Sequence, residues 1–84
     1  MAYQLIIRPS AERDLNSLPD KEVEQIVRRI IQLINNPRPF GIQKLVEEEG
    51  YRIRIGKYRI LFEIDDKKKV IFIFRIKHRK EVYR

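Results

Sequence analysis

The hydrophobic period of the sequence changes at Tyr51, and this change limits the folds that the chain can adopt. Between residues 23 and 34 the apolar residues recur at intervals of three and four, which is the spacing of an amphipathic helix. From Tyr51 onward apolar and polar residues alternate, which is the spacing of a half-buried strand. We therefore expect helices in the first half and strands in the second, within one domain spanning residues 1–84.

The remaining segments complete an α+β order. Residues 2–8 read as a short strand that Pro9 ends, and residues 10–18 read as a helix with Ser10 as its N-cap. Pro19 marks the start of the second helix, and strands follow at 51–55, 58–64 and 70–76. The sequence predicts a β-α-α-β-β-β order, with two N-terminal helices packed on one face of a small, mostly antiparallel β-sheet.

The hairpin between the first two of the later strands brings arginines together. Gly56 suits the first central position of a type II′ turn, and this turn fixes the register. Arg54 then lies opposite Arg59, with their β-carbons about 5 Å apart, and Arg52 lies on the same face. Extending the register to the last strand places Arg75 opposite Arg59. The alternation of that strand places a set of apolar residues on the face under the helices, namely Val70, Phe72, Phe74 and Ile76.

Such a row of arginines needs a reason, because like charges opposite each other cost up to about 1 kcal/mol per pair. Glu63 is the one acidic residue that these strands place on the arginine face. The row therefore indicates an anion site, and the planar fork of arginine suits phosphate. The alternative is a solvated basic face, neutralised by the acidic loop of residues 47–49.

The charge distribution points in the same direction. The net charge is +7, and residues 51–84 carry all of the excess, because residues 1–50 sum to −1. This asymmetry suggests a polyanionic partner, either nucleic acid or an acidic protein. The sequence has no cysteine and one histidine, His78, which argues against a metal site and favours the cytoplasm. No apolar run is long enough to cross a membrane.

Four stretches resemble the RelE/ParE superfamily of bacterial and archaeal toxins, and within it the RelE branch. They are "AERDLNSLP", "INNPRPFGIQKL", "YRIRIGKYRILFEID" and "IKHRKEVYR", and together they cover nearly the whole chain. The resemblance implies the toxin of a type II toxin–antitoxin system. It further implies an endoribonuclease that cuts mRNA in the ribosomal A site by attack of the 2′-hydroxyl on phosphorus, with no cofactor and no metal.

The resemblance also assigns roles in the hairpin. Arg52 and Arg54 match basic positions at which lysine is frequent, so arginine is a departure here, and its high pKa makes it a poor base. Arg59 matches a phosphate-contacting arginine.

In the tail, Arg79 matches a second phosphate-binding arginine, with Arg75 or Lys77 as alternatives. Tyr83 matches a tyrosine that stacks on a base or moves a proton. His78 is either a further acid or base or an exposed residue at a strand end.

The expected partners are a RelB-like antitoxin, in a toxin–antitoxin hetero-oligomer, and the ribosome with its mRNA. Two other functions stay open at this point. One is a ParE-like toxin that inhibits gyrase and has no nuclease activity. The other is an inactive relative that only binds RNA or the antitoxin.

Overall fold

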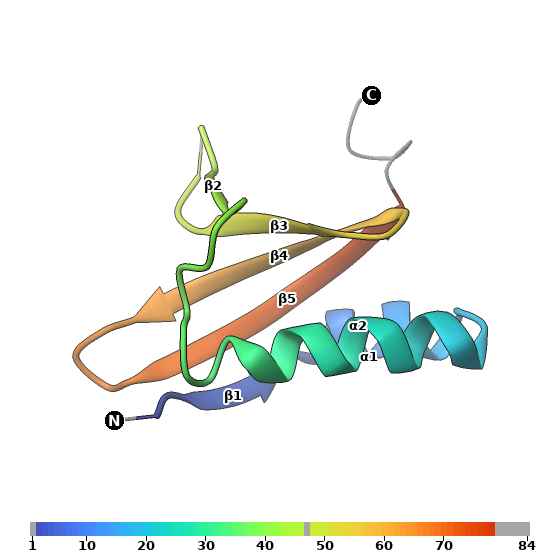
Figure 1. Ribbon diagram of the computed structural model, residues 1–84, viewed down its shortest axis with the longest axis horizontal. Helices are drawn as coiled ribbons and strands as arrows, with labels where there is room; N and C mark the ends of the chain where they lie inside the picture. The colour runs from blue at the N-terminus through green and yellow to red at the C-terminus, as the bar shows by residue number, and fades with distance from the viewer. Residues whose placement is uncertain (1, 47, 79–84) are drawn as a thin grey trace.

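The chain runs from a first strand through two helices into a curled sheet. The computed structural model describes residues 2–46 and 48–78. Figure 1 shows both helices on one side of the sheet, as the sequence predicts, and a short additional strand precedes the hairpin. The elements are β1 (Gln4–Ile7), α1 (Pro9–Asn16), α2 (Asp20–Gln32), β2 (Gln43–Lys44), β3 (Tyr51–Ile55), β4 (Tyr58–Asp65) and β5 (Val70–His78).

The five strands form a single sheet in the order β1-β5-β4-β3-β2. β1 pairs with β5 in parallel, whereas the other three pairings are antiparallel. The predicted α+β class with a mostly antiparallel sheet is therefore confirmed. The core lies between the helices and the sheet, where α2 contributes Ile26 and Ile30, which are at most 1% exposed. No helix in the described part of the chain is long and apolar enough to span a bilayer.

The predicted hairpin register is confirmed. Ile55 pairs with Tyr58, and Arg54 pairs with Arg59. Gly56 has a φ of +59° whereas Lys57 keeps a negative φ, which is the pattern of a type II′ turn. The turn chemistry thus sets the face on which each arginine emerges.

The predicted inner face of β5 is wrong. Asp65 pairs with Val70, one residue away from the predicted register, and a slip of one residue moves every side chain to the opposite face. Ile71 and Ile73 therefore enter the core, whereas Phe72 is only half-buried outside it. β5 lies between β1 and β4 and is apolar on both faces. Its alternation therefore could not decide which apolar residues face the core.

A bulge before the end of β5 shifts the register by one further residue and so restores the predicted facing of the side chains. Phe62 pairs with Ile73 but Leu61 pairs with Arg75, so Phe74 is the extra residue. The bulge returns Ile76 to the core, as predicted, and leaves Phe74 outside the core cluster.

The start of α1 also differs from the prediction. Arg8 occupies the N-cap position and Pro9 begins the helix, so Ser10 lies inside the first turn. Proline suits this position because the N–H of the first helical residue has no partner within the helix, so its absence costs no hydrogen bond. The hydroxyl of Ser10 donates instead to the carbonyl of Phe74 at 2.6 Å, which fastens α1 to the bulge.

An ion pair joins three distant segments at the edge of the molecule opposite the hairpin turn. Arg38, after α2, donates to both carboxylate oxygens of Asp66 at 2.9 and 3.1 Å. The hydroxyl of Tyr3 donates to the same carboxylate at 2.6 Å, and the Arg38 guanidinium lies 5.3 Å from the ring centroid of Tyr51. These bonds from Arg38 and Tyr3 lower the pKa of Asp66 from 3.8 to about 2.

Candidate functional site

Three arginines of the hairpin line one shallow pocket, which we call the arginine pocket. Its volume is about 230 Å³, and its lining consists of Gly41, Gln43, Arg52, Arg54 and Arg59. Among the described residues, this lining contains no carboxylate. The pocket therefore presents concentrated positive charge to anything that enters it.

The alternation of β3 and β4 explains why these three side chains meet. In β3 the isoleucines at 53 and 55 are buried, which turns Arg52 and Arg54 to the other face. Arg54 is exposed, whereas Arg59 is only 6% exposed. The face opposite the helices is thus not uniformly solvated, because the pocket holds one buried and one exposed arginine.

A neutral side chain fixes the third arginine. Gln43 of β2 pairs with Arg52 of β3, and its carbonyl oxygen accepts hydrogen bonds from Nε and Nη2 of Arg52 at 2.9 and 2.6 Å. An amide oxygen orients the guanidinium without cancelling its charge. Arg52 therefore keeps both its charge and its remaining N–H donors.

Arg75 does not join the pocket, and its predicted pairing with Arg59 is wrong. It lies opposite Leu61, and its Nε donates to a carboxylate oxygen of Asp14 in α1 at 2.9 Å. Lys77 takes the position opposite Arg59, because of the slip and the bulge in β5. The basic row thus continues across the sheet through Lys77, which is half-buried.

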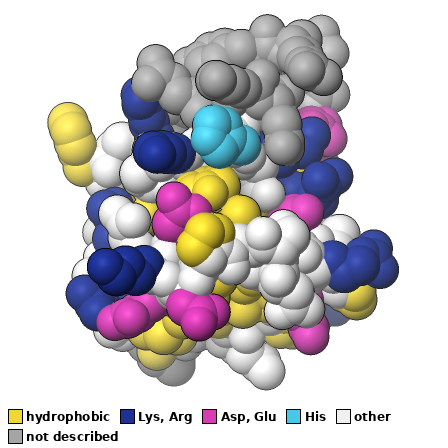
Figure 2. Space-filling view, turned by 90° about the vertical axis from the view of Figure 1, so that its right-hand side faces the viewer, with side chains coloured by type: hydrophobic (Ala, Val, Ile, Leu, Met, Phe, Trp, Pro, Cys, Tyr) yellow, Lys and Arg dark blue, Asp and Glu magenta, His cyan; other side chains and the backbone are white. Residues whose placement is uncertain are grey.

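His78 lies on the opposite side of the sheet from the arginine pocket. It pairs with Tyr58, whose ring it meets edge-on with centroids 5.5 Å apart. Tyr58 belongs to the core face and donates its hydroxyl proton to Glu22 of α2, which raises the pKa of the phenol. Figure 2 shows the single histidine at the surface, with basic side chains on both sides of it.

The tail residues Arg79 and Tyr83 lie outside the described residues. Their assignments therefore rest on the sequence alone.

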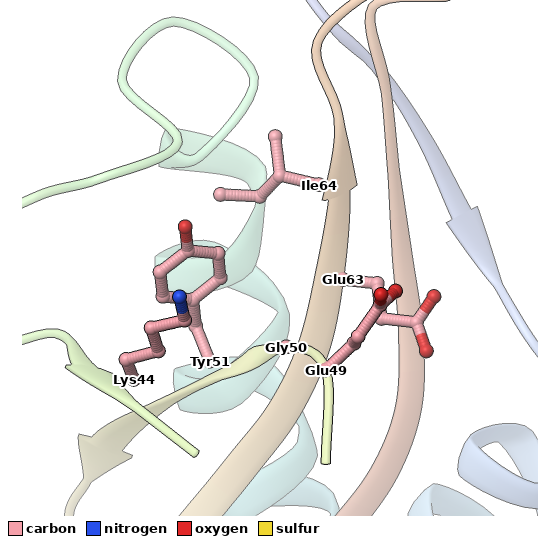
Figure 3. A pocket seen from close by; sticks show the side chains of 6 residues that line it. All are labelled: Lys44, Glu49, Gly50, Tyr51, Glu63 and Ile64. Carbon is pink, nitrogen blue, oxygen red and sulfur yellow. The ribbon is translucent and has the colours of Figure 1, made fainter. Parts of the chain in front are cut away.

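A second pocket of the same size has the opposite character. It is lined by Lys44, Glu49, Gly50, Tyr51, Glu63 and Ile64. Figure 3 shows the carboxylates of Glu49 and Glu63 side by side, away from the amine of Lys44. Two neighbouring carboxylates repel a phosphate, so this pocket does not suit a polyanion. Within residues 2–46 and 48–78, no cluster of three or more metal-binding side chains occurs.

Gly41 and Gln43 are the pocket residues that sequence reasoning missed. They belong to the stretch "INNPRPFGIQKL", but β2 has only two residues, which is too short to show an alternating pattern. The available signal was their position directly before the hairpin, because neighbouring segments often pair with each other.

Comparisons with known proteins agree on a family. A model described as the ParE toxin of the type II toxin–antitoxin system parDE matches residues 5–83. Toxin RelG of Mycobacterium tuberculosis is 30% identical over all of this chain and 99% of its own length. Putative toxin RelE1 of Methanocaldococcus jannaschii is 31% identical over all of this chain and 98% of its own length.

Solved structures agree as well. The toxin–antitoxin complex RelBE2 of Mycobacterium tuberculosis contains a chain with a TM-score of 0.84 and 30% identity, over 94% of this chain and 100% of that one. The RelE–RelB complex of Pyrococcus horikoshii gives a TM-score of 0.80 and 27% identity, over 94% and 97% of the two chains. Because the family model covers almost the whole sequence and these relatives are matched along nearly their full length, the chain belongs to the RelE/ParE superfamily of type II toxin–antitoxin toxins.

Proposed function

We propose that this toxin is a ribosome-dependent endoribonuclease that cleaves mRNA in the A site. The observation that carries the proposal is the arginine pocket, in which three guanidinium groups converge without a carboxylate in the described lining. A scissile phosphate is the ligand that this chemistry fits, because arginine forms paired hydrogen bonds to phosphate oxygens and stays charged.

The reaction needs no atoms from the protein. The 2′-hydroxyl of one nucleotide attacks the adjacent phosphorus, and the bond from phosphorus to the 5′-oxygen breaks. The hydroxyl loses one proton and the leaving 5′-oxygen gains one, which gives a 2′,3′-cyclic phosphate and a free 5′-hydroxyl. The protein must orient this attack and stabilise the charge on the phosphoryl oxygens.

The described residues suit those two tasks. Arg54 and Arg59 lie opposite each other and contact the non-bridging oxygens in this proposal. Arg52, held by Gln43, offers a guanidinium of fixed orientation. All three are poor bases because of their high pKa, so we assign the proton transfers to Tyr83 of the tail or to the ribosome. Arg79 and Lys77 are proposed as further phosphate contacts.

The partners follow from the relatives. The RelBE2 chain and the Pyrococcus RelE were each solved in complex with an antitoxin. We propose that a RelB-like antitoxin binds this chain in a hetero-oligomer, and that the toxin acts in the cytoplasm. The ribosome is assigned the task of positioning the mRNA, because one small pocket offers few contacts for choosing a sequence.

The test maps mRNA ends by primer extension in a translating extract that contains the antitoxin-free protein and ribosomes of a compatible organism. Arg54→Ala and Arg59→Ala should abolish cuts at A-site codons. Arg28→Ala is the matched control, because it removes an arginine from an exposed helical pair with Glu24. Intact mRNA with the folded wild-type protein would overturn the proposal.

A gyrase-inhibiting toxin is the second candidate, because the matching family model is that of ParE. A supercoiling assay separates the two functions. Inhibition of gyrase with intact mRNA would favour the ParE-like activity, and an effect in neither assay would indicate an inactive relative.

A further inference from the structure

One residue that adjoins the lining of the arginine pocket in the chain has an aromatic side chain fully exposed to water. Phe40 is 103% exposed, and the next residue, Gly41, lines the pocket. An isolated apolar residue at a surface needs no explanation. Phe40 differs from an isolated residue because its position and its backbone are both fixed relative to the three arginines.

A tight turn presents this side chain. The amide of Ile42 donates to the carbonyl of Pro39 at 3.3 Å, which places Phe40 and Gly41 at the two central positions of a β-turn. Gly41 has a φ of +93°, the conformation that the third residue of a type II turn requires. Phe40 therefore occupies the corner of a defined turn.

Both ends of this turn are anchored. Arg38, on one side, is fixed by its two hydrogen bonds to Asp66. Gln43, on the other side, is paired with β3 and bonded to Arg52 of the pocket. In Figure 1 this segment passes from the end of α2 along the sheet to β2. The backbone that carries the ring is thus preorganised, so a ligand that contacts the ring orders only one side chain.

We propose that Phe40 is a base-stacking residue, which holds a nucleobase of the RNA whose phosphate occupies the arginine pocket. This inference rests on the proposed function. An exposed aromatic ring next to a cationic groove is the arrangement by which proteins bind single-stranded nucleic acid: cations hold the backbone, and the ring stacks on a base. Stacking tolerates every base, so Phe40 contributes affinity and position rather than sequence choice.

The absence of tryptophan from the sequence provides a direct test. Phe40→Trp creates a single indole, whose fluorescence a stacked base quenches. The matched control is Val46→Trp, because Val46 is 97% exposed and does not line the arginine pocket. Circular dichroism checks that both variants are folded.

The probes are two hexameric oligonucleotides with 2′-O-methyl riboses, which cannot be cleaved. One carries bases at every position and the other is abasic, so that both offer the same phosphates. We expect the base-containing hexamer to quench the Phe40→Trp indole at low salt, and the abasic hexamer and the Val46→Trp control to show no quenching. Phe40→Ala should bind the base-containing hexamer about five- to a hundredfold more weakly than the wild type.

Three results would overturn the inference: no quenching of the Phe40→Trp indole, equal quenching by both hexamers, or unchanged affinity of Phe40→Ala. A change of the indole spectrum with an acidic antitoxin peptide, and none with RNA, would assign Phe40 to protein docking instead. The outcome is separate from that of the proposed function. Stacking without cuts in the translating extract would support the role of Phe40 and contradict the nuclease activity. Cuts without stacking would support the nuclease activity and contradict the role of Phe40.

Discussion

Two arginines, one bonded to Tyr51 of β3 and the other at the next position of that strand, differ in the charge of their partners. The hydroxyl of Tyr51 accepts hydrogen bonds from Arg38, whose own charge is matched by Asp66. The next residue, Arg52, is bonded to the neutral Gln43 on the other face. Arg38 is thus paired with a carboxylate, whereas Arg52 of the pocket is held by a neutral amide.

The charge of the hydrogen-bond partner distinguishes Arg38 from Arg52. A second carboxylate-matched arginine, Arg75, fixes β5 to Asp14 of α1. An ion pair satisfies both charges and leaves little for a ligand, whereas a guanidinium oriented by an amide oxygen still attracts phosphate. Removing a matched arginine should therefore reduce stability, and removing a pocket arginine should reduce activity.

The largest effect is expected at Arg54. Arg54→Ala should lower the rate of mRNA cleavage by about a hundredfold or more, as loss of a charge-stabilising donor does in other enzymes. The free energy of unfolding should stay within about 0.5 kcal/mol of wild type, because the side chain is exposed and its loss relieves repulsion by Arg59. Cleavage kinetics and urea unfolding measure the two quantities, and a loss of stability in place of activity would erase the contrast.

The opposite pattern is expected at Asp14. Asp14→Ala removes the acceptor of the Ile76 amide and of Arg75, so the free energy of unfolding should fall by about 1–3 kcal/mol. Below its unfolding transition the variant should cleave mRNA at nearly the wild-type rate. Asp14→Asn keeps an oxygen acceptor for the Ile76 amide and should lose less stability than Asp14→Ala. Unchanged unfolding of Asp14→Ala would show that the pairing has no structural role.

Gln43→Glu makes Arg52 resemble Arg38 and Arg75, because it gives Arg52 a carboxylate partner. Unit charges 4 Å apart interact by about 1 kcal/mol in water and about 4 kcal/mol near a protein surface, so cleavage should fall about tenfold or more. Stability should rise by no more than about 1 kcal/mol. Gln43→Ala is the control: it releases Arg52 without adding charge and should reduce cleavage less than Gln43→Glu does.

The smallest effect is expected from Asp66, and it depends on pH. The pKa of Asp66 is lowered from 3.8 to about 2 in the folded protein, so its ion pair stabilises the fold above about pH 4. This contribution is lost as the pH falls through the folded pKa. The difference in urea midpoint between wild type and Asp66→Asn should thus be constant from pH 7 to about 4, shrink below pH 4 and vanish below about pH 2. An undiminished difference at pH 2 would contradict the assignment.

Much of the arginine pocket could be predicted because Gly56 determines the register of the hairpin that carries its arginines. Once Gly56 sets the turn, local pairing places Arg52, Arg54 and Arg59 on one face. The predicted role of Arg75 in this row failed because it required the register across a loop. That loop contains Lys69 at a φ of +57°, a conformation that glycine or asparagine would have indicated but lysine does not.

The sequence by itself determined the order of the elements other than β2, the hairpin register and the family, since each follows from local period, turn chemistry or motif. The tertiary structure decided which apolar set of β5 turns inward, where the bulge at Phe74 falls, and that Gln43 rather than an acid meets Arg52. These outcomes depend on contacts between distant segments, and a strand that is apolar on both faces carries no local signal for its register.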